Sequence, residues 1–345
     1  MMQGGFLDFN PGEQHKTITV TTTKDLGVTG NFNIAYSIVT SGMTIPDWNS
    51  LIHSDPVGVN TKIVPKATSL PTRPTGLVKI FEENFGPDWT ATDTGFLADG
   101  VTPCWRTRHG HGRTQPGNKE IGYYSDPVIN PGTNSWIRDP VTGKVQLQLE
   151  YFPDGVKDIN GNNIPYDFVP VPAPGYFQFS STVLTTQRMA LDVLPGCYVE
   201  GRMSMPVKLG TWPAFWLLPK AFQTWPSIEV DFFEGFWNAL TLDKIGSTSH
   251  WKNATGGHSM FGEDLRHIGI TDYTQPLTWG WYWGEKEVTF YINDIPYSSH
   301  PNVFPTMPCF LLLDITTAPQ VVGPIPDPAN TLPAKMTMDW VRVWK

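Results

Sequence analysis

The sequence has 345 residues, a formal net charge of −8, 32 glycines, 32 prolines and 14 tryptophans. The acidic balance argues against a nucleic-acid partner, whose phosphate backbone favours basic proteins, and no apolar run approaches the roughly 20 residues of a membrane span. Few long amphipathic stretches are present, so we expect one large all-β domain plus something smaller. The tryptophan surplus suits stacking on sugar rings, although core packing explains many of these residues equally well.

The N-terminal part differs in pattern from the rest of the chain. Its first residues, MMQGGFLDFNPGEQH, lack the basic and apolar regions of a standard signal peptide. Thr, Val and Ile alternate with polar residues over 16–40, which predicts two or three short strands. The segment VPKATSLPTRPTG that follows later is typical of a linker. We therefore predict a small β-rich module at 1–64, a linker at 65–76 and the main domain at 77–345.

The main domain contains a series of short strand candidates separated by proline and glycine turns. The clearest are 143–152, 197–207, 287–294, 309–317 and 336–345. Because no helical stretch separates them, they predict a sandwich of antiparallel sheets. The region 153–175 contains several prolines and NGNN, and we expect a long loop there, of the kind that often carries function.

The cysteines and one histidine pair raise the question of metals. Cys104, Cys197 and Cys309 leave at least one thiol unpaired and lack the spacing of a metal site, so we expect buried free thiols. HGHG at 109–112 places two histidines at i and i+2, but no further ligands accompany them, so the pattern is weak evidence for a metal.

Three carboxylates lie close together in the stretch WPSIEVDFFEGFWN at 225–238. A helix would turn Glu229 and Asp231 about 200° apart, whereas a strand puts both on one face. Glu234 is an odd number of residues from the other two, so a regular strand would direct it to the opposite face. One extra residue, a β-bulge at Phe232–Phe233, would bring it back. The alternative is an exposed acidic strand without a catalytic role.

The segment GTWPAFWLLP at 210–219, followed by this acidic strand, resembles glycoside hydrolase family 16 in the bulged form of its E-x-D-x-x-E signature. Further segments follow in the family's order, namely NKEIGYYSDP (118–127), GCYVEGRMSMP (196–206), GSTSHW (246–251) and WGEKEVTFYINDIPY (283–297). The resemblance covers about 77–345. It implies a concanavalin-like jelly-roll β-sandwich and a retaining endo-β-glycanase of the laminarinase or exopolysaccharide-glycanase type. Asp314 stands where the family usually has Asn.

Cleavage of a glycosidic bond needs a carboxylate on one side and a carboxylic acid on the other, about 5–5.5 Å apart in a retaining enzyme. We assign Glu229 as the nucleophile and Glu234 as the general acid and later the base. Asp231 is expected to lie between them, to hydrogen-bond Glu229 and to couple electrostatically with both. Since close carboxylates do not all ionise easily, we expect a raised pKa for Glu234.

The resemblance also implies residues that bind the sugar. Trp212 and Trp225 are expected to line the donor-side subsites, and Trp237 is a third candidate for stacking, with core packing as the alternative for each. Asn118 and Glu120 are expected to hydrogen-bond the sugar, although Glu120 could equally belong to a plain turn.

Two further residues complete the expected substrate site. His250 is expected to contact the acid or the leaving-group side, with a satisfied core histidine as the alternative. Arg202 is expected either to hold a carboxylate at the site or to be an ordinary surface residue.

No cofactor is expected to be required for catalysis, but the resemblance implies a possible structural Ca²⁺. Asp339, in the last predicted strand, is the candidate ligand, with groups near the start of the domain at Glu83 and Asn84. Hard oxygen ligands of this kind suit Ca²⁺.

The leading interpretation is a retaining endo-β-glycanase that hydrolyses an extracellular polysaccharide. The alternative from another class is a non-catalytic carbohydrate-binding module of the same fold, which would have no need for the pair Glu229 and Glu234. A transglycosylase of the plant xyloglucan type ranks lower, because such proteins lack the bulge residue.

A polysaccharide partner lies outside the cell, yet the chain begins without a standard signal peptide. One explanation is that residues 1–64 anchor the chain in a larger assembly such as a virion tail, which would make it an exopolysaccharide depolymerase. Export by another route, or removal of a signal, are the alternatives.

Overall fold

The computed structural model describes residues 70–345 except 222–227, 238–244, 254, 265–269 and 271. The chain divides into two units between Pro65 and Lys66, and every described residue belongs to the second. The strands expected at 16–40 and the module expected at 1–64 lie outside the described residues, so the domain boundaries stay predictions.

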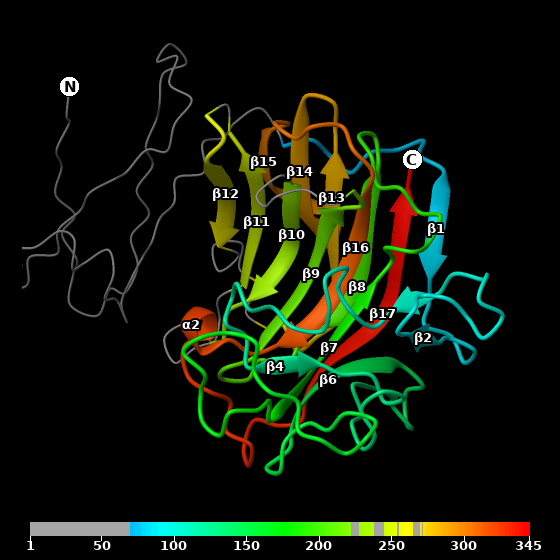
Figure 1. Ribbon diagram of the computed structural model, residues 1–345. Coiled ribbons are helices and arrows are strands. Elements are labelled where there is room, and N and C mark those ends of the chain that lie inside the picture. Colours follow the sequence, from blue (N-terminus) through cyan, green and yellow to red (C-terminus); the bar gives the residue numbers. More distant parts are fainter. Residues whose placement is uncertain (1–69, 222–227, 238–244, 254, 265–269, 271) are drawn as a thin grey trace, which may run out of the picture. The chain divides into compact units, whose positions relative to one another are not determined.

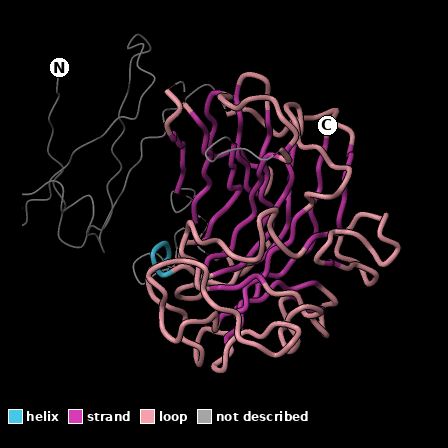
Figure 2. Tube along the Cα trace, viewed as in Figure 1, coloured by secondary structure: helices cyan, strands magenta, loops and turns pink. Residues whose placement is uncertain are grey.

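Strands dominate the described part of the chain, and the loops that join them gather at the ends of the sheets (Figure 2). The strands are β1 (Lys79–Glu83), β2 (Ala91–Thr92), β3 (Trp105–Arg106), β4 (Gly122–Tyr124), β5 (Trp136–Arg138), β6 (Val145–Tyr151), β7 (Phe179–Thr185), β8 (Tyr198–Ser204), β9 (Trp212–Pro219), β10 (Ile228–Gly235), β11 (Ile245–Lys252), β12 (His258–Asp264), β13 (Leu277–Trp283), β14 (Glu287–Ile292), β15 (Ile295–Pro301), β16 (Cys309–Thr316) and β17 (Ala334–Trp344). One short helix, α2 (Pro319–Val322), accompanies them in the described ranges. No helix there has the length and hydropathy that a membrane span needs.

The strands form two antiparallel layers, as in a jelly roll. One layer runs in the order β7-β16-β9-β10-β11-β12, and the other in the order β6-β17-β8-β13-β14-β15. A pairing between β6 and β7 links both into one 17-stranded sheet. Figure 1 shows β12, β11, β10 and β9 side by side in the first layer. The all-β sandwich predicted from the sequence is therefore confirmed.

The core between the layers is rich in aromatic side chains. Trp279, Trp281 and Trp283 alternate along β13 and are fully buried, because side chains two apart share one face of a strand. The ring of Phe233 lies 4.9 Å from that of Trp279, and the ring of Phe232 lies 5.6 Å from that of Trp281. Burying a large apolar side chain contributes about 1.5–3 kcal/mol, so these contacts hold β10 firmly against the opposite layer.

Two smaller predictions can also be compared with the structure. The region 153–175 lies between β6 and β7 and contains isolated β-bridges but no strand, so the long loop is confirmed. Cys104, Cys197 and Cys309 are all buried and free, as expected.

Candidate active site

A β-bulge in β10 decides which way its carboxylates point. Asp231 pairs with Thr248 of β11 and Glu234 pairs with Gly246, so three steps on β10 match two steps on β11. On the other side, Asp231 pairs with Trp216 and Phe233 with Phe215, which gives the same count of one extra residue. The bulge expected at Phe232–Phe233 is therefore confirmed.

The bulge works because both phenylalanines face the core. Phe232 and Phe233 are 1% and 0% exposed and pack in the same cluster, although consecutive residues of a regular strand would point to opposite faces. The residue after them, Glu234, consequently returns to the face that carries Glu229 and Asp231. The two buried rings thus provide the local reason for the arrangement of the three acids.

This face of the first layer forms the floor of a cleft with a volume of about 1240 Å³. Alternate residues of neighbouring strands line it, as the two-residue period of a strand requires. The lining residues on β9, β10, β11 and β16 are Trp212, Ala214, Trp216, Leu218, Pro219, Ile228, Glu229, Asp231, Glu234, Gly246, Thr248, His250, Phe310, Asp314 and Thr316. The structure thus brings the three predicted acids, together with His250 and Trp212, into one groove, and Asn118 and Glu120 line the same groove.

His250 contacts the first two acids from the neighbouring strand. It pairs with Glu229 in the β10–β11 register, and its Nε2 lies 3.3 Å from Asp231 Oδ2 and 3.9 Å from Glu229 Oε1. Burial lowers the pKa of His250, with an opposing effect from Glu229. Burial and the neighbouring Glu229 charge hold the pKa of Asp231 well above its usual range.

Glu234 has the environment that a general acid requires. Burial, followed by the charges of Asp231 and Glu229, raises its pKa well above the ordinary value, so its carboxyl keeps a proton at pH values where an exposed glutamate is ionised. The indole Nε1 of Trp212 donates a hydrogen bond of 3.1 Å to Glu234 Oε1 and opposes part of this rise. The pKa of Glu234 is raised as expected, and the pKa of Asp231 is raised as well.

A second group of acids, Asp314 and Glu120, lies beside the trio, and of these two only Asp314 was not predicted as part of the site. Asp314 accepts a hydrogen bond of 2.6 Å from Trp216 Nε1, and its Oδ2 lies 3.5 Å from the hydroxyl of Tyr124. That hydroxyl donates at 2.7 Å to Glu120 Oε2. Trp216 lies four residues after Trp212 on the same strand, so the two-residue period of a strand predicts that both face the cleft. For Asp314, the sequence offers only its departure from the family's Asn.

Glu120 is anchored rather than free to move. Besides Tyr124, it accepts hydrogen bonds from Asn118 Nδ2 at 3.0 Å and from Thr316 Oγ1 at 3.0 Å. Its side chain is buried, and burial raises the pKa of Glu120 to about 7 against the opposing effect of these donors. Burial and the Glu120 charge likewise raise the pKa of Asp314 well above its usual range. Asn118 and Glu120 therefore form part of a hydrogen-bonded wall of the cleft.

Two predicted substrate residues lie away from the cleft, and a third cannot be placed because it is outside the described residues. Trp237 is fully buried and packs 5.9 Å from the ring of Tyr273, so core packing accounts for it. Arg202 lies on the second layer, where its Nε donates at 3.1 Å to Asp339, so the carboxylate it holds is not one of the catalytic trio. Trp225 lies outside the described residues.

In the HGHG pair, His109 is buried and His111 is exposed. His109 is 2% exposed, and its ring stacks on that of His111 at 5.2 Å. Burial lowers the pKa of His109 to about 3, with a further effect of the His111 and Arg106 charges. In the described part of the chain, neither histidine belongs to a cluster with the composition of a metal site.

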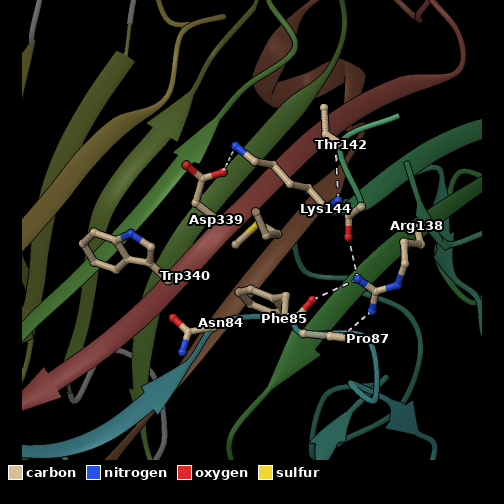
Figure 3. Close-up of a pocket in the computed structure, with 11 residues that line it drawn as sticks. Asn84, Phe85, Pro87, Arg138, Thr142, Lys144, Asp339 and Trp340 are labelled. Atoms are coloured by element: carbon tan, nitrogen blue, oxygen red, sulfur yellow. Dashed lines mark hydrogen bonds and ion pairs between the residues drawn. The ribbon is translucent and has the colours of Figure 1, made fainter. Parts of the chain in front are cut away.

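The residues around Asp339 do not fit a Ca²⁺ site (Figure 3). Its Oδ1 lies 2.5 Å from Lys144 Nζ and its Oδ2 lies 3.1 Å from Arg202 Nε. Glu83 is also engaged, because its two carboxylate oxygens accept hydrogen bonds from Phe85 N at 2.6 Å and from Trp105 Nε1 at 3.1 Å. Two cations beside Asp339 would repel a divalent ion that otherwise needs six to eight oxygen ligands.

Comparisons with known proteins agree with this architecture. No family model matches the chain. The chain is 26% identical over 220 residues to the endo-1,3-1,4-beta-glycanase EglC of Rhizobium meliloti, which covers 62% of the chain and 41% of that protein. It is 27% identical over 263 residues to glucan endo-1,3-beta-glucosidase A1 of Niallia circulans, covering 67% of the chain and 36% of the relative. The chain therefore spans well under half the length of these relatives.

A solved structure reports on the fold. SCLam, a non-specific endo-beta-1,3(4)-glucanase from family GH16, matches with a TM-score of 0.58 at 19% identity, over 81% of this chain and 100% of that chain. At this identity the likeness concerns the fold alone. The two sequence relatives above are both named as endo-acting enzymes on glycans. Together they confirm the resemblance to glycoside hydrolase family 16, with the concanavalin-like jelly roll as its fold.

Proposed function

We propose that this chain is a retaining endo-β-glycanase that hydrolyses a polysaccharide by double displacement. The observation that carries the proposal is the bulge in β10, which returns Glu234 to the cleft face beside Glu229 and Asp231. A carbohydrate-binding module would gain nothing from a buried acid with a raised pKa next to a carboxylate.

The mechanism divides into two steps. In the first, Glu229 attacks the anomeric carbon while Glu234 gives its proton to the glycosidic oxygen, and the bond between these two substrate atoms breaks. In the second, Glu234 takes a proton from water, the water oxygen bonds to the anomeric carbon, and the bond to Glu229 breaks. Each step leaves Glu234 in the protonation state that the next step needs. His250, whose Nε2 lies 3.9 Å from Glu229 Oε1 and 3.3 Å from Asp231 Oδ2, helps to position Glu229.

The cleft supports a glycan chain as the substrate. It is open and long enough to expose residues of β9, β10, β11, β12 and β16, and Trp212 and Trp216 lie on its floor, where indole rings can stack on sugar faces. Because the relatives are named as an endo-1,3-1,4-beta-glycanase and a glucan endo-1,3-beta-glucosidase, we propose β-1,3 and mixed-linkage β-glucans as the first substrates to test. A bacterial exopolysaccharide belongs in the same panel.

Product analysis tests the proposal. We expect the wild-type chain to release oligosaccharides, with the β-anomer formed first in NMR spectra of the early reaction. Glu234→Gln is expected to lower kcat by about 10²–10⁴-fold, the usual contribution of a general acid, and Glu229→Gln to abolish turnover. Glu285→Gln, an exposed glutamate between β13 and β14, serves as the matched control. Equal activity of Glu229→Gln and wild type, or an α-anomer as first product, would contradict the mechanism.

The site of action needs a separate test. We propose that the enzyme acts outside the cell as part of a virion, to which residues 1–64 attach it. Detection of the chain in purified particles by mass spectrometry would support this attachment, and its absence from particles of a producing culture would exclude it.

A further inference from the structure

The floor of the cleft also carries three atoms with the arrangement of metal ligands. One oxygen of Glu229, one oxygen of Asp231 and one ring nitrogen of His250 lie within 4.8 Å of one another. Imidazole and carboxylate groups together suit Zn²⁺ and the neighbouring transition metals. We propose that this trio binds a transition-metal dication such as Zn²⁺, and that the ion inhibits the enzyme by occupying its nucleophile.

The distances agree with tetrahedral coordination. Zn–N and Zn–O bonds of about 2.0–2.2 Å at the tetrahedral angle place neighbouring ligand atoms roughly 3.3–3.6 Å apart. His250 Nε2 lies 3.3 Å from Asp231 Oδ2 and 3.9 Å from Glu229 Oε1. The first distance already matches an edge of the tetrahedron. The second needs a small movement of Glu229, whose side chain is the most exposed of the three at 21%.

One buried carboxylate oxygen of the trio makes no hydrogen bond. Asp231 is 3% exposed, and its Oδ2 has only the His250 Nε2 contact at 3.3 Å, without a hydrogen bond among the described residues. A buried carboxylate oxygen in this state carries a free-energy cost of about 1–3 kcal/mol. A cation bound between Asp231 and His250 would give this oxygen a bonded partner in place of the 3.3 Å contact.

The neighbouring histidine supports the imidazole as a metal ligand. His250 Nδ1 lies 2.9 Å from His258 Nε2, and the two rings stack at 5.1 Å. A metal on His250 Nε2 selects the tautomer whose Nδ1–H donates to His258 Nε2. Ligating histidines in proteins almost always donate their other N–H in this way, and loss of such a partner weakens metal affinity about 10–100-fold.

The consequence for activity rests on the proposed function, but the binding does not. An ion held by Glu229 would neutralise the charge that attacks the anomeric carbon and would occupy part of the space of the sugar. We therefore expect inhibition that EDTA reverses and that a high concentration of glucan oligosaccharide relieves.

Calorimetric titration of the full chain with ZnCl₂, without substrate, tests the site directly. Wild type is expected to bind one ion in the cleft, and His250→Gln to lose at least about 100-fold in affinity, since a nitrogen ligand is removed. His258→Ala is expected to lose about 10–100-fold in Zn²⁺ affinity, because it removes the hydrogen-bond acceptor of the ligating His250. His111→Ala, the other histidine that lines the cleft, is the control and should bind as wild type does.

A crystal soaked in ZnCl₂ provides an independent readout by anomalous scattering. An anomalous peak between Glu229, Asp231 and His250 supports the proposal even if a variant folds poorly. Equal affinity of His250→Gln and wild type, loss of binding in His111→Ala, or an anomalous map without a peak at the trio would overturn it. A chain that binds Zn²⁺ at the trio but hydrolyses no glycan would refute the proposed function alone.

Discussion

At the scale of single residues, the cleft concentrates acids whose charges the protein does not easily accommodate. Burial raises the pKa values of Asp231, Glu234, Asp314 and Glu120, with contributions from the charges of neighbouring acids to the first three. Such a group suits acid catalysis because some members hold protons at neutral pH. Because each of these pKa values is raised, both the activity and the free energy of unfolding should depend on pH.

Trp212 is expected to tune the acid. Its indole N–H donates to Glu234 Oε1 at 3.1 Å and lowers the pKa of Glu234, so Trp212→Phe removes this effect while it keeps an aromatic ring. The pKa of Glu234 should then rise further, and the basic limb of the kcat/KM profile should move to higher pH by about one unit. A pH–rate profile from pH 4 to 10 measures this. A basic limb that stays in place or moves down would exclude Glu234 as the acid.

Glu120 is expected to make the protein less stable as pH rises. Its pKa is raised from 4.5 to about 7, so between these values the native state binds more protons than the unfolded state. The free energy of unfolding therefore falls with increasing pH across this window, by about 3 kcal/mol in total, and levels off above it. Glu120→Gln removes this titration.

Urea unfolding of wild type and Glu120→Gln at pH 5 and pH 8 would measure the effect. The difference between the two pH values should be smaller in the variant, since Asp231, Glu234 and Asp314 contribute the same sign in both proteins. An identical pH dependence of the two proteins would contradict the assignment.

The sequence predicts the positions of the three acids better than the positions of the side chains proposed to bind the sugar. The i, i+2, i+5 spacing of three acids in an apolar strand implies a bulge on geometric grounds alone. Trp237 and Arg202, in contrast, were chosen by residue type and resemblance. Which face a tryptophan occupies depends on strand register, and which acid an arginine pairs with depends on contacts across the sheet. Asp314 joins the cleft through a strand far from Glu234 in the chain.

At the scale of elements, β10 owes its function to the packing of β13 behind it. Phe232 and Phe233 both face the core because Trp279 and Trp281 offer aromatic surfaces to them. Strands with a clear two-residue alternation were predicted closely, as for β6 and β17. Several other strands were not predicted, including β7 and β13, and strands of two or three residues such as β2 and β3 carry too little pattern to be recognised.

Deletion of Phe233 tests the bulge directly. Without the extra residue of β10, Glu234 would follow Asp231 by two positions, so a regular strand would still place it on the cleft face. We expect the deletion variant to keep measurable hydrolysis and to have a lower melting temperature by circular dichroism, because the buried ring of Phe233 is lost. Phe233→Leu keeps the residue count and loses only part of the contact with Trp279, so it should cost less than about 1.5 kcal/mol and keep most of the activity. A deletion variant that folds but hydrolyses no glucan would contradict the parity argument.

At the scale of the whole molecule, ion pairs from Lys144 and Arg202 to Asp339 stabilise the region where a structural Ca²⁺ was expected. Lys144 and Arg202 occupy both oxygens of this carboxylate, so we expect EDTA or added Ca²⁺ to leave the melting temperature unchanged in differential scanning calorimetry. Lys144→Gln should lower it by no more than about 2–4 °C, since a partly exposed ion pair contributes about 1 kcal/mol or less. A fall in EDTA that Ca²⁺ restores would show that a metal binds after all.

The position of β17 has a consequence for synthesis. This strand pairs with β8 on one side and with β6 and β1 on the other, so residues that leave the ribosome late complete a layer begun much earlier. Until 334–344 emerge, β6 and β8 keep exposed edges that could join another nascent chain. Production at lower temperature, or with a chaperone that shields such edges, should therefore raise the yield of soluble protein.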